Sequence, residues 1–525
     1  MSTAAGFHLF LAVAAILSQH VQSADILVVT STYNSPWMDV AKIAEALASR
    51  GHVVTVLAHA NQKSDLMRKW PTLQYETFGD PEKTPSIKEL TKSLPQKVFS
   101  SPRTLDLLTF ARALSSALVD LSEEMLVDNQ LLTKLKNSRY DVVLTYSGNS
   151  CGPLVAQFLD LPLVCTMRSL PLGQDIRATG VPHPLAYVPT VTSELSDRMT
   201  FSQRVKNVRF YFAGSIVGQL LFDKGFDDVA KRTIGEKFTM SAGLARTDVW
   251  LYQSDLMFDF PKPMMPNMVS IAGHVAEDVK PLSEEMEKFV QSSGDDGVVL
   301  VTFGSMIAAM PAEIADMLAA AFARLPQKVV WRYAGTPPPS LGPNTKTMEW
   351  VPQNDLLAHP KTKVFVSHCG YNGVAEAMYH GVPLVGMPLF LDQFDNIARM
   401  VARGMGVSLD IHKVTSKEVY RAISTVISDP SYKEKANQIS THLRDQPQSP
   451  MERAVWWIEH VIKHGGLPHL RSRAPELPFY QYYLLDVIAL IVAVISAVLL
   501  SCWKCCSFAC CMCKRDNTNT KKKTN

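Results

Sequence analysis

Hydrophobic and polar residues in the first half of the chain follow the order typical of alternating strands and helices. Apolar runs predict strands at Asp25–Thr30, His52–Ala58, Asp141–Thr145 and Leu163–Thr166, and an amphipathic period predicts a helix at Met38–Ser49. Short apolar strands joined by helices are typical of a parallel sheet covered on both faces, so we expect a Rossmann-like domain. No Gly-x-Gly-x-x-Gly motif follows the first strand, which argues against a dinucleotide there.

The same order of elements begins again after the middle of the chain. Gly297–Ser305 predicts a strand that runs into a glycine turn, Pro311–Leu325 a helix opened by proline, and Lys328–Tyr333 the next strand. This second Rossmann-like unit is expected to end near Ser440. Before it, Phe201–Phe238 is a long aromatic segment with a helical pattern.

One stretch of the second unit, Trp350–Asn396, carries the candidate chemistry. Its pattern predicts strands at Lys363–Ser367 and Leu384–Met387, with a helix between them from about Asn372 to His380. The His-Cys-Gly-Tyr-Asn-Gly turn therefore lies where the carboxyl end of a strand meets the amino end of a helix. Such a position attracts phosphate, because the first N–H groups of a helix have no partner within the helix.

Both ends of the chain predict a membrane-bound, secretory-pathway protein. The apolar run Phe7–Leu17 and the small residues before Ala24 predict a signal peptide at 1–23. Residues 484–503 are apolar, and at about 1.5 Å per residue they span the roughly 30 Å of a bilayer core. The positive residues that follow favour a cytosolic tail, hence a single-pass type I protein with its body in the lumen. The terminal Lys522–Asn525 is either an endoplasmic-reticulum retrieval signal or only a stop-transfer flank.

Composition narrows the function classes. The net charge of +3 over 525 residues gives no reason to expect a nucleic-acid partner. Six of the nine cysteines lie between Cys502 and Cys513, beside the predicted membrane segment, where acylation or packing is favoured over zinc because no partner histidine follows. Cys151, Cys165 and Cys369 are too few for a disulfide framework.

The stretch Trp350–Asn396 resembles the signature of the UDP-glycosyltransferases, and the likeness extends from about Asp25 to the C-terminal tail. It is most like the vertebrate-type UDP-glucuronosyltransferases. The resemblance implies that Trp350 stacks on uracil, Gln353 neighbours the uridine and Glu376 holds the ribose hydroxyls. It also implies pyrophosphate contact by His368, close backbone approach at Gly370, Asn372 and Gly373, and sugar contacts by Asp392 and Gln393. With Ser305, these residues form the expected donor-binding set.

The fold class implied by this resemblance is α/β of the GT-B type, with two Rossmann-like domains facing a cleft and one C-terminal transmembrane helix. The expected divisions are a signal peptide at 1–23, an acceptor-binding domain at 24–285, a UDP-sugar-binding domain at 286–445, returning helices and a linker at 446–483, a transmembrane helix at 484–503 and a cytosolic tail at 504–525. On the same resemblance, Phe201–Phe238 covers the acceptor pocket or lies against the membrane. The alternative is a plain core helix.

Two positions depart from the family's pattern. Inverting members activate the acceptor with a histidine after the first strand and an aspartate after a later strand, and these positions hold Pro36 and Tyr146. The catalytic residues are therefore unknown. Loss of a general base typically costs about 100- to 10,000-fold, and hydroxyl acceptors suffer most because an amine lone pair needs no base to attack.

Two functions remain open at this point. One is inverting transfer, with glucuronosyl as the implied group, from a UDP-sugar to a small lipophilic acceptor, with amines favoured. The other is a catalytically impaired, UDP-sugar-binding regulatory subunit of active relatives. No cofactor or metal is expected, since a histidine and helix N–H groups can neutralise the departing UDP and no Asp-x-Asp occurs. The expected partners are the UDP-sugar, the acceptor, the endoplasmic-reticulum membrane and, in homo- or hetero-oligomers, family members.

Overall fold

The computed structural model describes residues 23–33, 35–90, 98–99, 103–147, 151–168, 173–254, 257–276, 279–304, 306–307 and 309–521. Residues 1–22 of the predicted signal peptide, Ser305 and the Lys522–Asn525 tail lie outside the described residues. The chain divides into two compact units, Met1–Arg471 and Ser472–Asn525.

The first unit opens with a seven-stranded parallel sheet in the order β3-β2-β1-β4-β5-β6-β7. Its central strands are almost continuously apolar and buried, as strands covered on both faces by helices must be. We call this sheet and its helices the N-terminal lobe. The strands are β1 (Asp25–Val29), β2 (Val53–His59), β3 (Gln74–Phe78), β4 (Val142–Tyr146), β5 (Leu163–Met167), β6 (Thr247–Tyr252) and β7 (Met268–Ser270).

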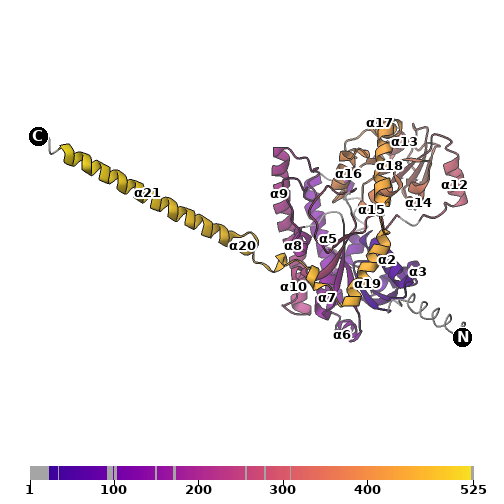
Figure 1. Cartoon of the computed structure of the whole chain (residues 1–525). Helices are drawn as coiled ribbons and strands as arrows, with labels where there is room; N and C mark the ends of the chain where they lie inside the picture. The colour runs from indigo at the N-terminus through magenta and orange to yellow at the C-terminus, as the bar shows by residue number, and fades with distance from the viewer. Residues whose placement is uncertain are drawn as a thin grey trace, which may run out of the picture. The chain divides into compact units, whose positions relative to one another are not determined.

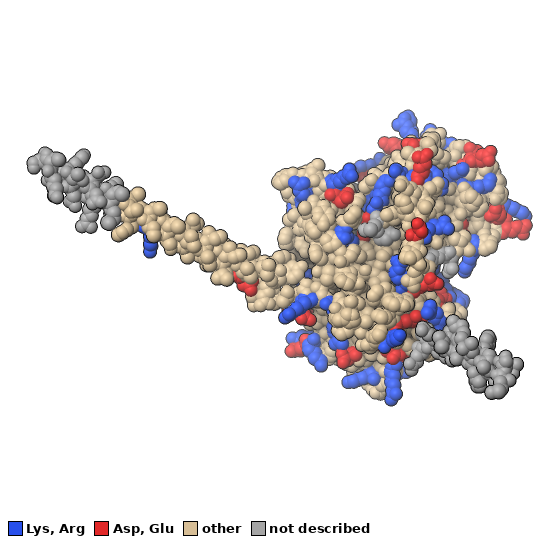
Figure 2. All heavy atoms as spheres, viewed as in Figure 1, with Lys and Arg blue, Asp and Glu red and all other residues tan. Residues whose placement is uncertain are grey.

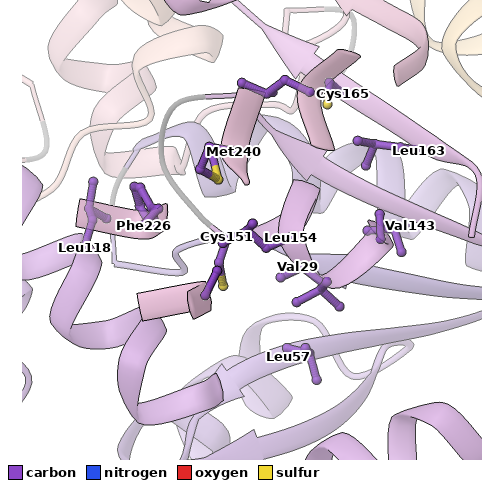
Figure 3. Packing of buried hydrophobic residues seen from close by; sticks show 14 of the residues in the cluster. Val29, Leu57, Leu118, Val143, Cys151, Leu154, Leu163, Cys165, Phe226 and Met240 are labelled. Atoms are coloured by element: carbon purple, nitrogen blue, oxygen red, sulfur yellow. The ribbon is translucent and has the colours of Figure 1, made fainter. Parts of the chain in front are cut away.

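Helices cover both faces of this sheet and bury two separate apolar clusters (Figure 1). Figure 3 shows the first cluster, in which Leu118, Leu154, Phe226 and Met240 from four helices pack near the strand residue Val29. The helices of this lobe are α2 (Ser35–Ser49), α3 (Lys63–Lys69), α5 (Arg103–Leu126), α6 (Asn129–Asn137), α7 (Gly152–Leu159), α8 (Gly173–Thr179), α9 (Phe201–Gly218), α10 (Lys224–Thr233) and α11 (Met240–Ala245).

A second parallel sheet, in the order β10-β9-β8-β11-β12-β13, forms the core of what we call the C-terminal lobe. Its strands are β8 (Val298–Thr302), β9 (Lys328–Arg332), β10 (Thr345–Met348), β11 (Thr362–Ser367), β12 (Leu384–Gly386) and β13 (Gly406–Ser408). Its helices are α12 (Glu284–Gln291), α13 (Ala312–Phe322), α14 (Gln353–Ala358), α15 (Tyr371–His380), α16 (Gln393–Ala402), α17 (Ser416–Ser428) and α18 (Pro430–Arg444). Two Rossmann-like sheets in one chain are the architecture of the GT-B fold.

The next helix, α19 (Pro450–His464), returns to the N-terminal lobe. Ala454 and Ile458 are fully buried in the second apolar cluster, together with residues of α2 and β6. Beyond it, the buried carboxylate of Asp248 accepts hydrogen bonds from the backbone N–H of Leu467 at 2.7 Å and from Arg471 at 2.7 Å. The C-terminal part of this unit is therefore fastened to the first sheet.

The segment Phe201–Phe238 is not a plain core helix. Its helical part is interrupted by a π-helical turn at Gln219–Asp223 between α9 and α10. In α9, Asn207 is the only buried residue, whereas Phe201, Phe212 and Ile216 are more than half exposed. The aromatic and aliphatic residues of α9 thus form an outward-facing stripe instead of a core.

The second unit contains α20 (Phe479–Tyr482) and α21 (Leu485–Lys521). Among the described residues, α21 is the one helix whose length and composition suffice to cross a membrane, over Leu485–Cys510. This apolar C-terminal helix fits a membrane anchor.

Candidate functional site

The predicted phosphate-binding turn lies between β11 and α15. Cys369, in the middle of the turn, has a left-handed backbone (φ 64°), a conformation that glycine adopts most easily. Its N–H donates to the Ser367 hydroxyl at 3.0 Å, and Gly370 then begins the helix without a side-chain cap. The first N–H groups of α15 consequently have no competing side-chain acceptor at their cap, which suits an anion.

Two glycines make room for the imidazole of His368. A Cβ atom at Gly304 would lie 2.4 Å from His368 Nε2, and one at Gly370 would lie 2.5 Å from the same atom. Gly304 also has a left-handed φ of 78°, so a larger residue is disfavoured there twice. Burial, followed by the charges of Arg332 and Arg168, lowers the pKa of His368 to about 4, although a hydrogen bond to the Thr302 backbone acts in the opposite direction. The imidazole is thus neutral at pH 7.

Two of the predicted uridine-side residues, Gln353 and Glu376, form one hydrogen-bonded group with Thr302. The Thr302 hydroxyl donates to Gln353 Oε1 at 2.6 Å, and Gln353 Nε2 donates to Glu376 Oε2 at 2.6 Å. Burial raises the pKa of Glu376 to about 7, while its bond with Gln353 acts to lower it. Trp350 stands nearby with two thirds of its surface exposed, and the Arg332 guanidinium lies 5.5 Å from its ring centre. An exposed indole is available for stacking.

Asp392 and Gln393 lie at the start of α16 and are joined to the phosphate turn. Asn396 Nδ2 bridges the two loops, donating to Asp392 Oδ2 at 2.9 Å and to the Cys369 carbonyl at 3.0 Å. Gln393 is buried, and its Oε1 accepts the backbone N–H groups of Leu389 and Phe390, so part of its role is to hold the preceding loop. Asp392 remains partly exposed.

The structure therefore brings nine of the ten predicted donor-binding residues to one edge of the second sheet. Trp350, Gln353, His368 and Glu376 follow the carboxyl ends of strands or lie on the helices after them, as ligand-binding residues do in open α/β sheets. The tenth, Ser305, lies outside the described residues.

Across from this edge, the N-terminal lobe contributes residues that the sequence did not single out. Asp39, on α2, accepts a hydrogen bond from Asn372 Nδ2 at 2.7 Å, and Arg168, directly after β5, lies 3.6 Å from the other oxygen of Asp39. Burial alone would lower the pKa of Arg168, but Tyr146, Asp39 and Asp392 raise it. Asp39 could have been noticed, since it lies one helical turn after Pro36. Arg168 offered no such signal.

The two positions that depart from the family's pattern belong to this N-terminal lobe. Pro36 lies in the first turn of α2, and Tyr146 is the last residue of β4. Tyr146 interacts electrostatically with Arg168. Neither a histidine nor an aspartate occupies these two positions, which the family resemblance assigns to the pair that activates the acceptor.

A second set of contacts connects α16 to the N-terminal lobe. Asp395 accepts the backbone N–H groups of Thr192 at 2.5 Å and Glu194 at 2.9 Å, and both of these residues have left-handed backbones. On the same helix, Arg399 Nε lies 3.2 Å from Asp259 Oδ1, and both side chains are almost fully buried. Asp395 and Arg399 thus hold α16 against the N-terminal lobe at two places.

No group of three histidine, cysteine, aspartate or glutamate side chains that could hold a metal ion occurs within the described ranges. The polar atoms of the site belong instead to amides, carboxylates, arginines and one imidazole. This donor set suits hydrogen bonding to hydroxyl and phosphate groups.

Comparison with known proteins places this site in a family. The chain matches the family model described as "UDP-glucoronosyl and UDP-glucosyl transferase" over residues 24–522. UDP-glucuronosyltransferase 2B33 of Macaca mulatta is 40% identical over 490 residues, covering 92% of this chain and 92% of the relative. UDP-glucuronosyltransferase 2B10 of Homo sapiens is 38% identical over 490 residues, covering 92% of this chain and 93% of the relative.

Solved structures share the fold at low sequence identity. The spinosyn forosaminyltransferase SpnP superposes with a TM-score of 0.56 and 18% identity, covering 84% of this chain and 100% of that chain. A UDP-glucosyltransferase from Polygonum tinctorium gives a TM-score of 0.55 with 16% identity, covering 84% of this chain and 99% of that chain. The GT-B architecture, the match over nearly the whole length and the full-length relatives lead to one conclusion: the chain is an enzyme that belongs to the UDP-glycosyltransferase family.

Proposed function

We propose that this enzyme transfers glucuronic acid from UDP-glucuronate to small lipophilic acceptors and that it favours amines. The observation that carries the proposal is the grouping of the expected donor-binding residues around His368 at one edge of the second sheet. In the opposite lobe, Pro36 and Tyr146 stand in place of the histidine and aspartate with which the family activates its acceptors. In an inverting transfer, the acceptor attacks the anomeric carbon as UDP departs from the opposite side.

In this proposal the C-terminal lobe holds the donor. Trp350 stacks on the uracil, and Glu376, positioned by Gln353, accepts hydrogen bonds from the ribose hydroxyls. His368 and the N-terminal N–H groups of α15 meet the pyrophosphate, while Asp392 bonds to sugar hydroxyls. UDP-glucuronate is the proposed donor because the full-length relatives carry the name UDP-glucuronosyltransferase.

The preference for amines follows from what the N-terminal lobe lacks. A phenol must lose its proton as the new bond forms, and without a base this step costs about 100-fold or more. A neutral amine attacks with its lone pair and can lose its proton afterwards. The absence of the histidine and aspartate therefore penalises hydroxyl acceptors more than amines.

We also propose that the enzyme is a single-pass type I protein of the endoplasmic-reticulum membrane with its catalytic body in the lumen. The apolar helix α21 would be the anchor. The exposed stripe of α9, formed by Phe201, Phe212 and Ile216, recurs at helical spacing and would rest on the lipid surface. Figure 2 shows few charged side chains where α9 lies.

The proposal is tested by turnover in microsomes that contain the full-length chain. UDP-glucuronate, UDP-glucose and UDP-galactose are each supplied with an aromatic amine and with a phenol of similar shape. We expect turnover with UDP-glucuronate and a higher rate for the amine. Equal rates for the amine and the phenol would remove the amine preference, and a higher rate with another donor would change the sugar.

A second candidate function rests on Pro36 and Tyr146 themselves. If the absence of the catalytic histidine and aspartate abolishes transfer, the chain would act as a UDP-sugar-binding regulatory subunit of active relatives. That function predicts saturable binding of UDP-glucuronate with no transfer to any acceptor of the panel. It also predicts a changed rate when an active relative is co-expressed.

The affinity for UDP should depend on pH through Glu376. With a pKa of about 7, this carboxyl is mostly protonated below that value and ionised above it, and only the ionised form can accept hydrogen bonds from two ribose hydroxyls with both oxygens. We expect the affinity of the wild type relative to Glu376→Gln to rise roughly tenfold from about pH 6 to about pH 8. Calorimetric titration measures the UDP affinity of both proteins at each pH. If the two affinities changed with pH in parallel, the role of Glu376 would be contradicted.

A further inference from the structure

A buried carboxylate lies where the family's base is missing. Asp39 follows Pro36 by one helical turn on α2, so both residues lie on the same side of the helix. Its side chain is fully buried at the contact between the two lobes. Asn372, at the start of the phosphate-binding helix α15, donates to Asp39 Oδ1 at 2.7 Å.

Two atoms of this contact have unused hydrogen-bonding capacity. Within the described part of the chain, Asp39 Oδ2 and Asn372 Oδ1 are buried and have no hydrogen-bond partner. The nearest cation to Oδ2 is Arg168, at 3.6 Å, which is an ion-pair distance and too long for a hydrogen bond. A buried acceptor that lacks a hydrogen-bond donor is uncommon in proteins, so these two oxygens beside the expected substrate site point to a ligand group that donates to them.

We propose that Asp39 accepts the N–H proton of an amine acceptor during glycosyl transfer and so replaces the missing base for this substrate class. The proposal rests on the proposed function. The nitrogen lone pair forms the bond to the anomeric carbon, and the bond from that carbon to the phosphate oxygen breaks, with its electron pair leaving on UDP. The nitrogen then carries a positive charge, and its proton passes to Asp39 Oδ2 and later to solvent.

This assignment explains why amines, rather than phenols, suit the site. A carboxylate is a weak base for a neutral hydroxyl, whereas an N–H becomes strongly acidic once the nitrogen is alkylated and charged. Burial raises the pKa of Asp39 and so makes its carboxylate a stronger base, while Arg168 and Asn372 act to lower the pKa and so stabilise the ionised form. Lys42 and Glu376 are the other charged side chains that influence it.

The arrangement also connects proton acceptance to donor binding. Asn372 belongs to the turn expected to hold the pyrophosphate, and its amide group has two N–H bonds. One N–H contacts Asp39 across the lobes, which leaves the other for a phosphate oxygen. A bound donor would therefore hold Asn372, and through it Asp39, at the reacting centre.

The test compares two acceptors in the full-length enzyme supplied with UDP-glucuronate: a primary aromatic amine, which has a proton to lose, and a tertiary amine, which has none. Asp39→Asn keeps the size and the bond to Asn372 but cannot take the proton. We expect its kcat for the primary amine to fall about 100-fold, at the lower end of the effect of a general base, and its kcat for the tertiary amine to change by less than about fivefold. UDP affinity should stay within about threefold of wild type.

The matched control is Asp395→Asn, which removes the charge of another carboxylate that joins the lobes. Because it lies away from Asp39, it should lower turnover of both amines by the same factor. An equal loss on both amines in Asp39→Asn, no loss at all, or loss of UDP binding would each assign Asp39 to lobe contact and overturn the proposal. If the wild type itself transfers to neither amine while binding UDP-glucuronate, the proposed function fails, and this inference fails with it.

Discussion

Replacement of His368 by alanine is expected to lower kcat for transfer from UDP-glucuronate by roughly 100- to 1,000-fold, the cost of one oriented donor to a developing anion. The imidazole occupies the space left by Gly304 and Gly370, so its orientation is fixed before any substrate arrives. A fixed N–H that meets the departing phosphate stabilises the transition state more than the bound donor, because negative charge grows there as the bond breaks. UDP affinity should therefore fall less than kcat does.

His380, the last residue of α15, provides the matched control, because this helix directly follows the turn that contains His368. Its Nε2 lies 2.8 Å from Asn354 Oδ1, away from the glycine-lined position of His368. His380→Ala should change kcat by no more than about threefold. Single-turnover measurements with saturating donor separate chemistry from binding. Similar losses in the two variants, or a loss confined to KM in His368→Ala, would contradict the role in leaving-group stabilisation.

The charge state of His368 refines the expectation from sequence that a histidine neutralises the departing UDP. With a pKa of about 4 in the free enzyme, the ring donates a hydrogen bond as a neutral group. The positive charges near the ring are instead Arg332 and Arg168, whose presence is one cause of that low pKa. Since kcat/KM reports free-enzyme groups, its pH profile should show no descending limb near pH 6.5 that His368→Ala removes.

Much of the fold could be predicted because its central strands carry a strong local signal. The prediction of a strand at Lys363–Ser367 agrees with β11 to within one residue, since an apolar run buried on both faces has few alternatives. The edge strand β3, Gln74–Phe78, was missed because it is half polar and mostly half-buried. The long helical pattern at Phe201–Phe238 predicted helix correctly but could not show that its apolar residues face outward.

The candidate site divides in the same way. The predicted residues from His368 to Glu376 belong to one strand–turn–helix unit, so their proximity could be predicted from spacing. Trp350, Gln353, Asp392 and Gln393 lie outside this unit, and the family resemblance predicted them. Asp39 and Arg168 reach the site only because two separate sheets face each other, and no local pattern specifies which loops meet. Gly304 is likewise required by a histidine 64 positions away in the chain, because a Cβ atom at position 304 would collide with the ring of His368. Long-range complementarity of this kind requires the folded structure.

The contacts of Asp259 show how the N-terminal lobe holds α16 in place. Asp259 precedes β7 in the N-terminal lobe and is almost fully buried. Its carboxylate accepts a hydrogen bond from Lys262 at 2.9 Å and forms an ion pair with Arg399 of α16 at 3.2 Å, and the Tyr252 hydroxyl also donates to it. Arg403, the residue directly after α16, donates to the Asp259 backbone carbonyl. One carboxylate thus compensates two buried cations from different lobes.

Asp259→Ala is therefore expected to have the largest effect on stability, lowering the free energy of unfolding by about 3–5 kcal/mol. The cost arises because Arg399 and Lys262 would remain buried without their counter-ion. Since α16 begins with Asp392 and Gln393, UDP-sugar affinity should fall as the helix loses its support. Thermal unfolding of the detergent-solubilised protein and calorimetric UDP titration measure the two effects.

The control for this variant is a carboxylate with an ion pair in solvent. Asp65 on α3 pairs with Arg68 at 2.8 Å, but both side chains are more than two thirds exposed. Asp65→Ala should change stability by less than about 1 kcal/mol, because water and side-chain entropy offset the attraction of exposed charges. The double variant Asp259→Ala with Arg399→Met should regain part of the lost stability, because it removes one of the two stranded cations together with its partner. If Asp259→Ala were as stable as Asp65→Ala, or if it unfolded at lower temperature while UDP affinity stayed unchanged, the ion pair would not be what supports the donor-binding end of α16.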